Sequence, residues 1–332
     1  MSALPHVVIL ATGGTIAGRS VSRTDSIAYQ PAAVAIEALL AALPELESVA
    51  RVSGEQFAQI ASADVTVALW QRLALQVSAL LADASVDGVV ITHGTDTMEE
   101  TAWFLNLTVA NLKPVVLVGA MRPSSALSAD GPANLLHAVR VAATPAATGR
   151  GVLVVMHAHV HAAREVAKFN TSALDAFRSH DAGVLGTIIG DQVHWSRTPT
   201  KPHTLASPFC AAAAGALPAV EILFGYAGCS RTSIDALVRA GIAGLVFAGV
   251  GDGCVSAGTL AALLEARRAG VQIVRASRVA SGYVSRNGQV DDDGCDFIAA
   301  GSLSPQKARI VLMLGLAAGG DTTQLQSWFD ML

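Results

Sequence analysis

Short apolar runs rich in β-branched residues alternate with longer segments rich in alanine and leucine along the first half of this chain. Four of the runs predict strands, at 7–10, 89–92, 115–118 and 152–156. The intervening segments predict helices at 31–43, with Pro31 in its first turn, at 64–82, at 98–108 and after Pro132. Strands and helices that alternate at this spacing form right-handed crossovers. We therefore expect an α/β fold with a doubly wound, mostly parallel sheet.

The alternation stops between residues 197 and 218, where Pro199, Pro202 and Pro208 stand among polar residues. We interpret this segment as a linker between two domains. Beyond it the pattern resumes, with strands predicted at 220–224, 244–248 and 271–276 and helices at 233–240, 259–269 and from Ser304-Pro305 onward. The sequence thus predicts an N-terminal catalytic α/β domain at 1–196 and a smaller C-terminal α/β domain with a parallel sheet at 219–332.

Composition excludes several classes of protein. Hydrophobic residues make up 52% of the chain and charged residues 14%, which is too apolar for a disordered protein. The 22 basic and 26 acidic residues give a net charge of −4 without a basic cluster, so nucleic-acid binding is not expected. Glycine, proline or polar residues interrupt every apolar stretch before it reaches membrane-spanning length, so no membrane association is expected.

The N-terminal residues and the cysteines bear on the cellular compartment. The first residues show neither the basic segment nor the long apolar core of a secretion signal. We therefore expect a cytoplasmic location, or a periplasmic one if a signal has been removed. The four cysteines are far apart and form no CxxC pair, so we expect buried free thiols at Cys210, Cys229, Cys254 and Cys295.

Three loops are rich in hydroxyl groups: 12–18 (TGGTIAG), 62–64 (SAD) and 92–97 (THGTDT), of which the first and third follow predicted strands. In parallel sheets, ligands bind beyond the carboxyl ends of strands. Thr15 follows a Gly-Gly turn whose N–H groups could bind an oxyanion or a carboxylate, although a plain βα connection has the same pattern. In the third loop Thr95 stands beside Asp96, and His93 is either a base or a brace for the backbone.

Two other readings of these polar residues are weaker. The segment GGTIAG is neither a dinucleotide-binding GxGxxG motif nor a Walker loop. His157, His159 and His161 alternate after a predicted strand and could share a face that binds a metal. Because no carboxylate accompanies them, we interpret them as solvated and expect no metal site.

Longer motifs carry more information. The segments ATGGTIAG from Ala11, ITHGTDTMEETAWFLNLT from Ile91 and KPVVLVGAMRPSSALSADGPANL from Lys113 resemble the bacterial-type L-asparaginase family, closest to its type II members, with the glutaminase-asparaginases included. The resemblance extends to residues 304–309 (SPQKAR). It implies hydrolysis of L-asparagine to L-aspartate and ammonia through a threonine acyl-enzyme, with glutamine as a minor substrate and no cofactor. It also implies a homotetramer, a dimer of dimers with shared active sites.

The same resemblance assigns roles to individual residues. Thr15 corresponds to the nucleophile, Tyr29 to a tyrosine of the lid, and Thr95, Asp96 and Lys168 to a second catalytic group. Ser62 matches the serine that holds the substrate α-carboxylate, Asp96 pairs with the substrate ammonium, and the substrate site further includes Gly14 and Ala120.

These roles agree with elementary chemistry. An alcohol is a weak nucleophile that needs a base, and a lysine kept neutral by burial could act as one through a hydroxyl. Lys168 acting through Thr95 is the hypothesis, and an ordinary surface lysine is the alternative.

The chain departs from the family pattern at substrate contacts. Ala63 stands where the family has glutamine, and Gln289 where a neighbouring subunit offers glutamate. Asp252 and Cys254 replace two asparagines of a glycine loop. We therefore keep two alternatives to an amidohydrolase open. One is an amino-acid-binding or sensing protein with slow or no turnover, and the other is a nucleotide-binding α/β protein.

Overall fold

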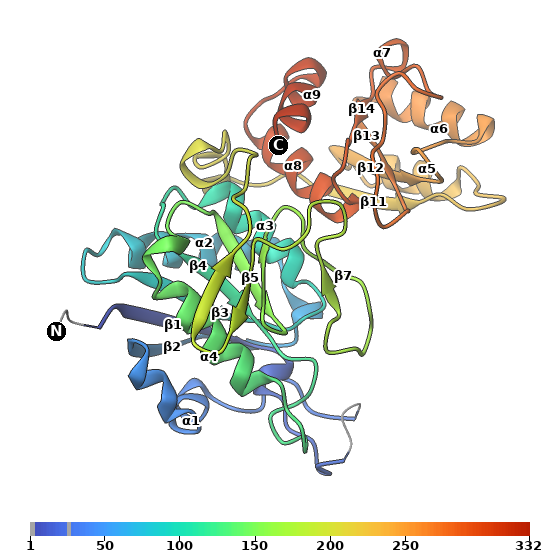
Figure 1. Ribbon diagram of the computed structural model, residues 1–332. Coiled ribbons are helices and arrows are strands. Elements are labelled where there is room, and N and C mark those ends of the chain that lie inside the picture. Colours follow the sequence, from blue (N-terminus) through green and yellow to red (C-terminus); the bar gives the residue numbers. More distant parts are fainter. Residues whose placement is uncertain (1–3, 25–27) are drawn as a thin grey trace. The chain divides into compact units, whose positions relative to one another are not determined.

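The computed structural model describes residues 4–24 and 28–332 and separates the chain into two units, Met1–Ser207 and Pro208–Leu332 (Figure 1). The division falls inside the proline-rich segment 197–218. Within the described residues no helix combines the length and the apolar character needed to cross a bilayer. The four cysteines are free thiols, as expected, but they are half-buried rather than buried.

In the described part of the first unit, eight strands form one sheet with the order β10-β9-β6-β5-β4-β3-β1-β2. Five of them run parallel: β1 (His6–Gly13), β2 (Arg51–Ile60), β3 (Gly88–Thr92), β4 (Val115–Val118) and β5 (Val152–Met156). Three antiparallel strands extend it: β6 (His159–Ala162), β9 (Gly186–Ile189) and β10 (Gln192–Trp195). A separate hairpin consists of β7 (Ala167–Lys168) and β8 (Phe177–Arg178). The predicted α/β fold with a mostly parallel sheet is confirmed.

Helices cover both faces of this sheet. They are α1 (Ile36–Ala41), α2 (Val67–Ala82), α3 (Met98–Thr108) and α4 (Gly131–Ala142). Helix α4 packs against β3, β4 and β5, and its core cluster includes Ile9, Val90 and Val116. The intervening residues, such as Val89 and Leu117, point to the opposite face of the sheet and are equally buried, because helices cover that face as well. Burial on both faces explains why the strands read as continuous apolar runs.

The helix predicted from Pro31 is wrong at its N-terminus, because α1 begins only at Ile36. The residues before it bond to the loop after β1 instead of to each other. Ala32 N–H donates to the carbonyl of Gly14 at 3.0 Å, and Val34 N–H donates to the carbonyl of Ala17 at 2.9 Å. This tertiary hydrogen bonding overrides the local preference for helix.

Strand β2 and the antiparallel strands were not predicted. Every residue of β2 is half-buried or exposed, and its sequence, RVSGEQFAQI, contains a glycine and several polar residues. It lies at one edge of the sheet, and β10 lies at the other. Edge strands bury less apolar area, so their sequences carry a weaker pattern.

The second unit contains a four-stranded parallel sheet with the order β11 (Val220–Phe224), β12 (Gly244–Gly249), β13 (Gln272–Ser277) and β14 (Ile298–Ala299). Its helices are α5 (Thr232–Arg239), α6 (Ala257–Arg268), α7 (Asp292–Cys295), α8 (Pro305–Ala317) and α9 (Thr322–Met331). Ser304 caps α8 by accepting a hydrogen bond from Lys307 N–H, with Pro305 in the first turn. The smaller parallel-sheet domain is thereby confirmed.

Candidate active site

Three hydroxyl-bearing loops meet at one edge of the large sheet. Strand β1 lies between β2 and β3, and all three are parallel, so their carboxyl ends point the same way. Thr15 follows β1, Ser62 follows β2 and Thr95 follows β3. Neighbouring strands therefore bring these side chains to the same edge, where parallel sheets bind ligands.

Glycines allow the three loops to approach one another closely. Gly14 has a φ of 78°, and a Cβ placed on it would lie 2.3 Å from the Cα of Gly94. A Cβ on Gly94 would lie 2.6 Å from the Ser62 Oγ. Both distances are shorter than any real carbon contact, so neither position has room for a side chain. The backbones of the loops after β1 and β3 are in direct contact.

Thr15 opens a single 3-10 turn, Thr15–Ala17, and is 7% exposed. Its Oγ1 lies 2.6 Å from the phenolic oxygen of Tyr29, and either hydroxyl can be the donor. Two backbone hydrogen bonds of 2.9 Å between Arg19 and Gln30 hold the backbone next to Tyr29. The threonine hydroxyl thus has a defined partner within the described residues.

Thr95, Asp96 and Lys168 form a second polar cluster. Lys168 lies on β7, and its Nζ donates to Thr95 Oγ1 at 2.8 Å and to Asp96 Oδ1 at 2.6 Å. The lysine side chain is 17% exposed, whereas the Asp96 side chain is 65% exposed. Lys168 is therefore not a solvated surface lysine. The Asp96 carboxylate remains accessible to a ligand.

Ser62 joins the loops after β2 and β3. Its buried Oγ accepts a hydrogen bond from Asp96 N–H at 3.1 Å, and its carbonyl accepts one from Thr97 Oγ1 at 2.7 Å. Ala63, next along the 3-10 turn Ser62–Asp64, is exposed. Ala120 follows β4, the next strand in the sheet, and is fully buried. Ser62 therefore supports the loop that carries Thr95.

His93 braces the backbone. Its Nδ1 lies 2.7 Å from the Gly94 carbonyl oxygen, which can only accept, so Nδ1 carries the proton. Its Nε2 lies 3.0 Å from Thr101 Oγ1, which in turn receives the indole N–H of Trp70 at 2.8 Å. Burial lowers the pKa of His93 to about 4, although the bond to Gly94 and the charge of Asp96 oppose this shift. The imidazole is neutral at pH 7, and both its nitrogens are engaged in hydrogen bonds, so the geometry favours a brace over a base.

Sequence reasoning missed some residues that shape the site. Glu99, in the first turn of α3, accepts the backbone N–H of Lys168 at 2.5 Å and is almost fully buried. Thr101 and Trp70 complete the brace around His93. Two consecutive acidic residues in an otherwise uncharged helix, Glu99-Glu100, were the available signal, because a buried carboxylate requires a partner.

Asp252 and Gln289 belong to the second unit, on loops that follow β12 and β13. Asp252 Oδ1 accepts the backbone N–H of Ser285 at 2.7 Å. The thiol of Cys254 donates to Gln289 Oε1 at 2.9 Å. These two hydrogen bonds link the loop that carries Asp252 to the loop that carries Gln289. The other candidate residues all lie in the first unit.

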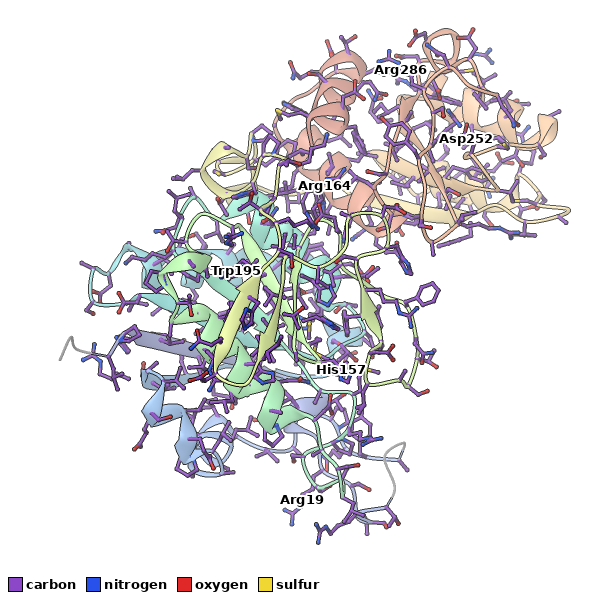
Figure 2. All side chains as sticks on the ribbon, viewed as in Figure 1. Arg19, His157, Arg164, Trp195, Asp252 and Arg286 are labelled. Atoms are coloured by element: carbon purple, nitrogen blue, oxygen red, sulfur yellow. The ribbon has the colours of Figure 1, made fainter. Side chains whose placement is uncertain are left out.

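The three histidines after β5 do not share one strand. His157, labelled in Figure 2, lies in the turn between β5 and β6 with a φ of 50°, whereas His159 and His161 lie on β6. Successive ring centroids are 6.2 and 6.0 Å apart. Across residues 4–24 and 28–332, no three histidine, cysteine or acidic side chains are grouped in a way that could hold a metal ion.

Two family models and several curated proteins are similar to this chain, and all of them are described as asparaginases or glutaminase-asparaginases. A family model described as the N-terminal asparaginase domain matches residues 6–201, and one described as the glutaminase/asparaginase C-terminal domain matches residues 219–329. A protein of Haemophilus influenzae described as "Probable L-asparaginase periplasmic" is 46% identical over 98% of this chain and 93% of its own length. A "Glutaminase-asparaginase" of Pseudomonas fluorescens is 46% identical over 98% of this chain and 90% of its own.

A solved structure is also similar. It is that of a probable cytoplasmic L-asparaginase from Campylobacter jejuni, and it superposes with a TM-score of 0.95 at 42% identity. The match covers 99% of this chain and all of that one.

Proposed function

Because the chain belongs to the asparaginase family, we propose that it hydrolyses L-asparagine to L-aspartate and ammonia through an acyl-enzyme on Thr15. The observation that carries this proposal is the pair of hydroxyl contacts at one sheet edge. Thr15 is hydrogen-bonded to Tyr29, and Thr95 is hydrogen-bonded to Lys168. The loops that carry Thr15 and Thr95 are in direct backbone contact. Nucleophilic catalysis by a hydroxyl requires a nearby group that can accept its proton, and a lysine in its neutral form can serve as that base.

The reaction has two halves. In the first, Thr15 Oγ1 bonds to the amide carbon and gives up its proton. Lys168 accepts this proton through Thr95 when its amine is neutral and no longer paired with Asp96, and the C–N bond then breaks as the same proton passes to the leaving nitrogen, which departs as ammonia. In the second half, water attacks the ester and restores the Thr15 hydroxyl. Both halves pass through a tetrahedral oxyanion, which backbone N–H groups around Thr15 and Thr95 stabilise.

Polar side chains on the loops after β2 and β3 recognise the substrate. The exposed carboxylate of Asp96 pairs with the substrate ammonium, and the hydroxyl of Ser62, next to Asp96, binds the α-carboxylate. Gly14 and Ala120 line the same site. Ala63 offers no polar side chain, so fewer contacts anchor the longer glutamine, and asparagine is the preferred substrate.

The complete site requires a second copy of the chain. We assign Asp252 and Gln289 to the active site of a neighbouring subunit in a homotetramer built as a dimer of dimers. The N-terminal domain, placed at 1–196, holds the nucleophile, and the C-terminal domain at 219–332 supplies these two loops. We place the enzyme in the cytoplasm, the location ascribed to the similar protein of Campylobacter jejuni.

A second candidate function is an amino-acid-binding or sensing protein with little turnover. Ala63, Cys254 and Gln289 favour it, because each is less suited to substrate contact than the residue expected there. Such a protein would bind asparagine without releasing ammonia.

Ammonia release separates the two functions. Purified protein is incubated with L-asparagine, L-glutamine, D-asparagine and small amides, and the Thr15→Ala variant serves as the control. Release from L-asparagine that depends on Thr15 supports the asparaginase. Binding of asparagine, measured by calorimetry, without release of ammonia would favour the sensor.

A further inference from the structure

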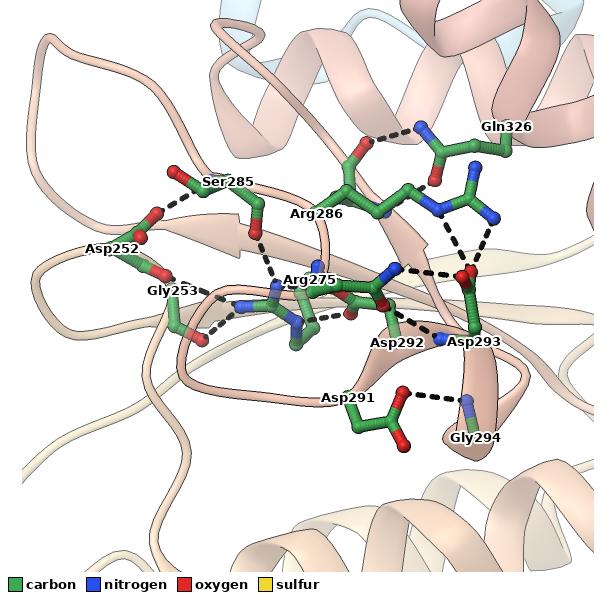
Figure 3. Close-up of polar contacts among 12 residues, drawn as sticks. Asp252, Gly253, Arg275, Ser285, Arg286, Asp291, Asp292, Asp293, Gly294 and Gln326 are labelled. Atoms are coloured by element: carbon green, nitrogen blue, oxygen red, sulfur yellow. Dashed lines mark hydrogen bonds and ion pairs between the residues drawn. The ribbon is translucent and has the colours of Figure 1, made fainter.

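Two loops of the second unit meet at the carboxyl ends of neighbouring strands. One follows β12 and carries Asp252, which is labelled in Figure 3, and the other follows β13 and carries Gln289. They contact each other through the Asp252–Ser285 and Cys254–Gln289 hydrogen bonds. These two contacts are partly solvent-exposed, so they alone would not hold the loops firmly.

A buried arginine beneath the loops makes the stronger connection. Arg275, on β13, is fully buried, and its guanidinium makes five hydrogen bonds, which matches its five N–H groups. Nε and Nη2 donate to the two carboxylate oxygens of Asp292, at 2.5 and 2.6 Å. The remaining three N–H groups donate to the carbonyls of Asp252, Gly253 and Ser285, at 3.3, 3.0 and 2.9 Å. One side chain therefore binds the backbone of both loops.

Each partner of Arg275 is itself tied down. Asp292 is fully buried at the start of α7 and also accepts the backbone N–H of Asn287 at 2.9 Å. Gly253 has a φ of 66°, and a Cβ there would lie 3.0 Å from Arg275 Nη1 and 2.9 Å from Val284. The guanidinium fills the space that a side chain at residue 253 would need, so the loop closes directly onto the arginine.

We propose that Arg275 is a positioning residue that holds the loops of Asp252 and Gln289 as one preformed substrate-binding surface. This inference rests on the proposed function, which assigns those two residues to substrate contact. The surface acts on binding, because neither loop carries a reacting group of the proposed mechanism. Loss of the clamp therefore raises KM and leaves kcat nearly unchanged.

Two variants test the clamp. In Arg275→Lys the charge opposite Asp292 remains, but a single ammonium cannot reach both carboxylate oxygens and three carbonyls. In Arg275→Met/Asp292→Leu both buried charges are removed, a change that often preserves or raises stability. Both variants should raise KM for L-asparagine about tenfold or more, with kcat within about threefold of wild type.

Arg286→Lys is the matched control, because Arg286 lies on the same loop and pairs with Asp293 at the surface. It should keep the wild-type KM. Thermal melting of every variant shows which of them are folded. A double variant that melts like wild type and has a wild-type KM would overturn the proposal, because a merely structural ion pair predicts that result.

Hydrogen exchange provides a readout that does not depend on turnover. In Arg275→Lys, peptides covering 250–255 and 283–291 should both exchange faster, while peptides of the first unit stay unchanged. Unchanged exchange in these loops would refute the clamp. If wild type released no ammonia, the proposed function would fail, and the exchange experiment would still decide whether Arg275 holds the two loops together.

Discussion

The brace around His93 predicts an acid-sensitive first unit. In the folded chain the pKa of His93 is about 4, because the imidazole is buried, against 6.5 for the free side chain. The unfolded chain therefore binds more protons between these two values, and folding stability falls as the pH falls. The contribution of neutral His93 to the unfolding free energy is fully present above pH 6.5 and is lost as the pH falls towards 4.

The magnitude follows from the two pKa values. A single group with these values removes about 2 kcal/mol of unfolding free energy at pH 5 and about 3 kcal/mol at pH 4, relative to pH 8. The His93→Asn variant keeps a donor for the Gly94 carbonyl but does not titrate in this range. It should be less stable at pH 8, because Thr101 loses its imidazole partner, and its stability should depend less on pH by the amounts above.

Urea denaturation at pH 8, 6 and 5, followed by tryptophan fluorescence, measures the effect. Trp70, which is hydrogen-bonded to Thr101, contributes to this signal together with the other three tryptophans. Other groups titrate as well, so the test is the difference between wild type and variant. The control is His194→Asn, at an exposed position on β10, which should retain the wild-type pH dependence. An equal loss of stability in wild type and His93→Asn between pH 8 and pH 5 would refute the reasoning.

Four shorter predictions concern the proposed reaction. Thr15→Ala should fold normally and lose several orders of magnitude in kcat, and retention of a tenth of the wild-type value would rule out Thr15 as nucleophile. Lys168→Met should lower kcat at least about a hundredfold, and unchanged kinetics would contradict its role as proton acceptor. Asparagine should exceed glutamine in kcat/KM, and Ala63→Gln should narrow the difference; equal wild-type values would refute the preference. Light scattering should report a tetramer, and an active monomer at assay concentration would contradict the shared site.

The central elements of the fold were predictable because burial leaves a strong trace in sequence. Helix α3 and strands β4 and β5 have the predicted bounds, and nearly all their residues are buried. Strand β2 was missed because it is an edge strand that is partly exposed to solvent, so its sequence mixes polar and apolar residues. The start of α1 was misplaced because its backbone bonds to a distant loop, which no local pattern reports.

The candidate site divides in the same way. Thr15 and Thr95 follow strands that the sequence reveals, so their position at the sheet edge could be derived. Lys168 lies 73 residues beyond Thr95, on a two-residue strand, and only the family resemblance singled it out. Arg275 places a charge inside the largely apolar strand QIVRAS, and this pattern is visible in the sequence. Such a charge indicates a buried partner, but it does not identify the partner.

The order of the strands explains why these contacts occur together. Since β1 lies between β2 and β3, the loop that carries Thr15 is flanked by those of Ser62 and Thr95. Close packing of Gly14 against Gly94 lets one loop set the position of the next, and Ser62 fixes the backbone of Asp96. The brace of His93 and the ion pair of Lys168 then act on a loop already held from both sides. The polar groups of the proposed reaction are therefore placed chiefly by backbone packing, and their hydrogen bonds refine a geometry that the sheet has already imposed.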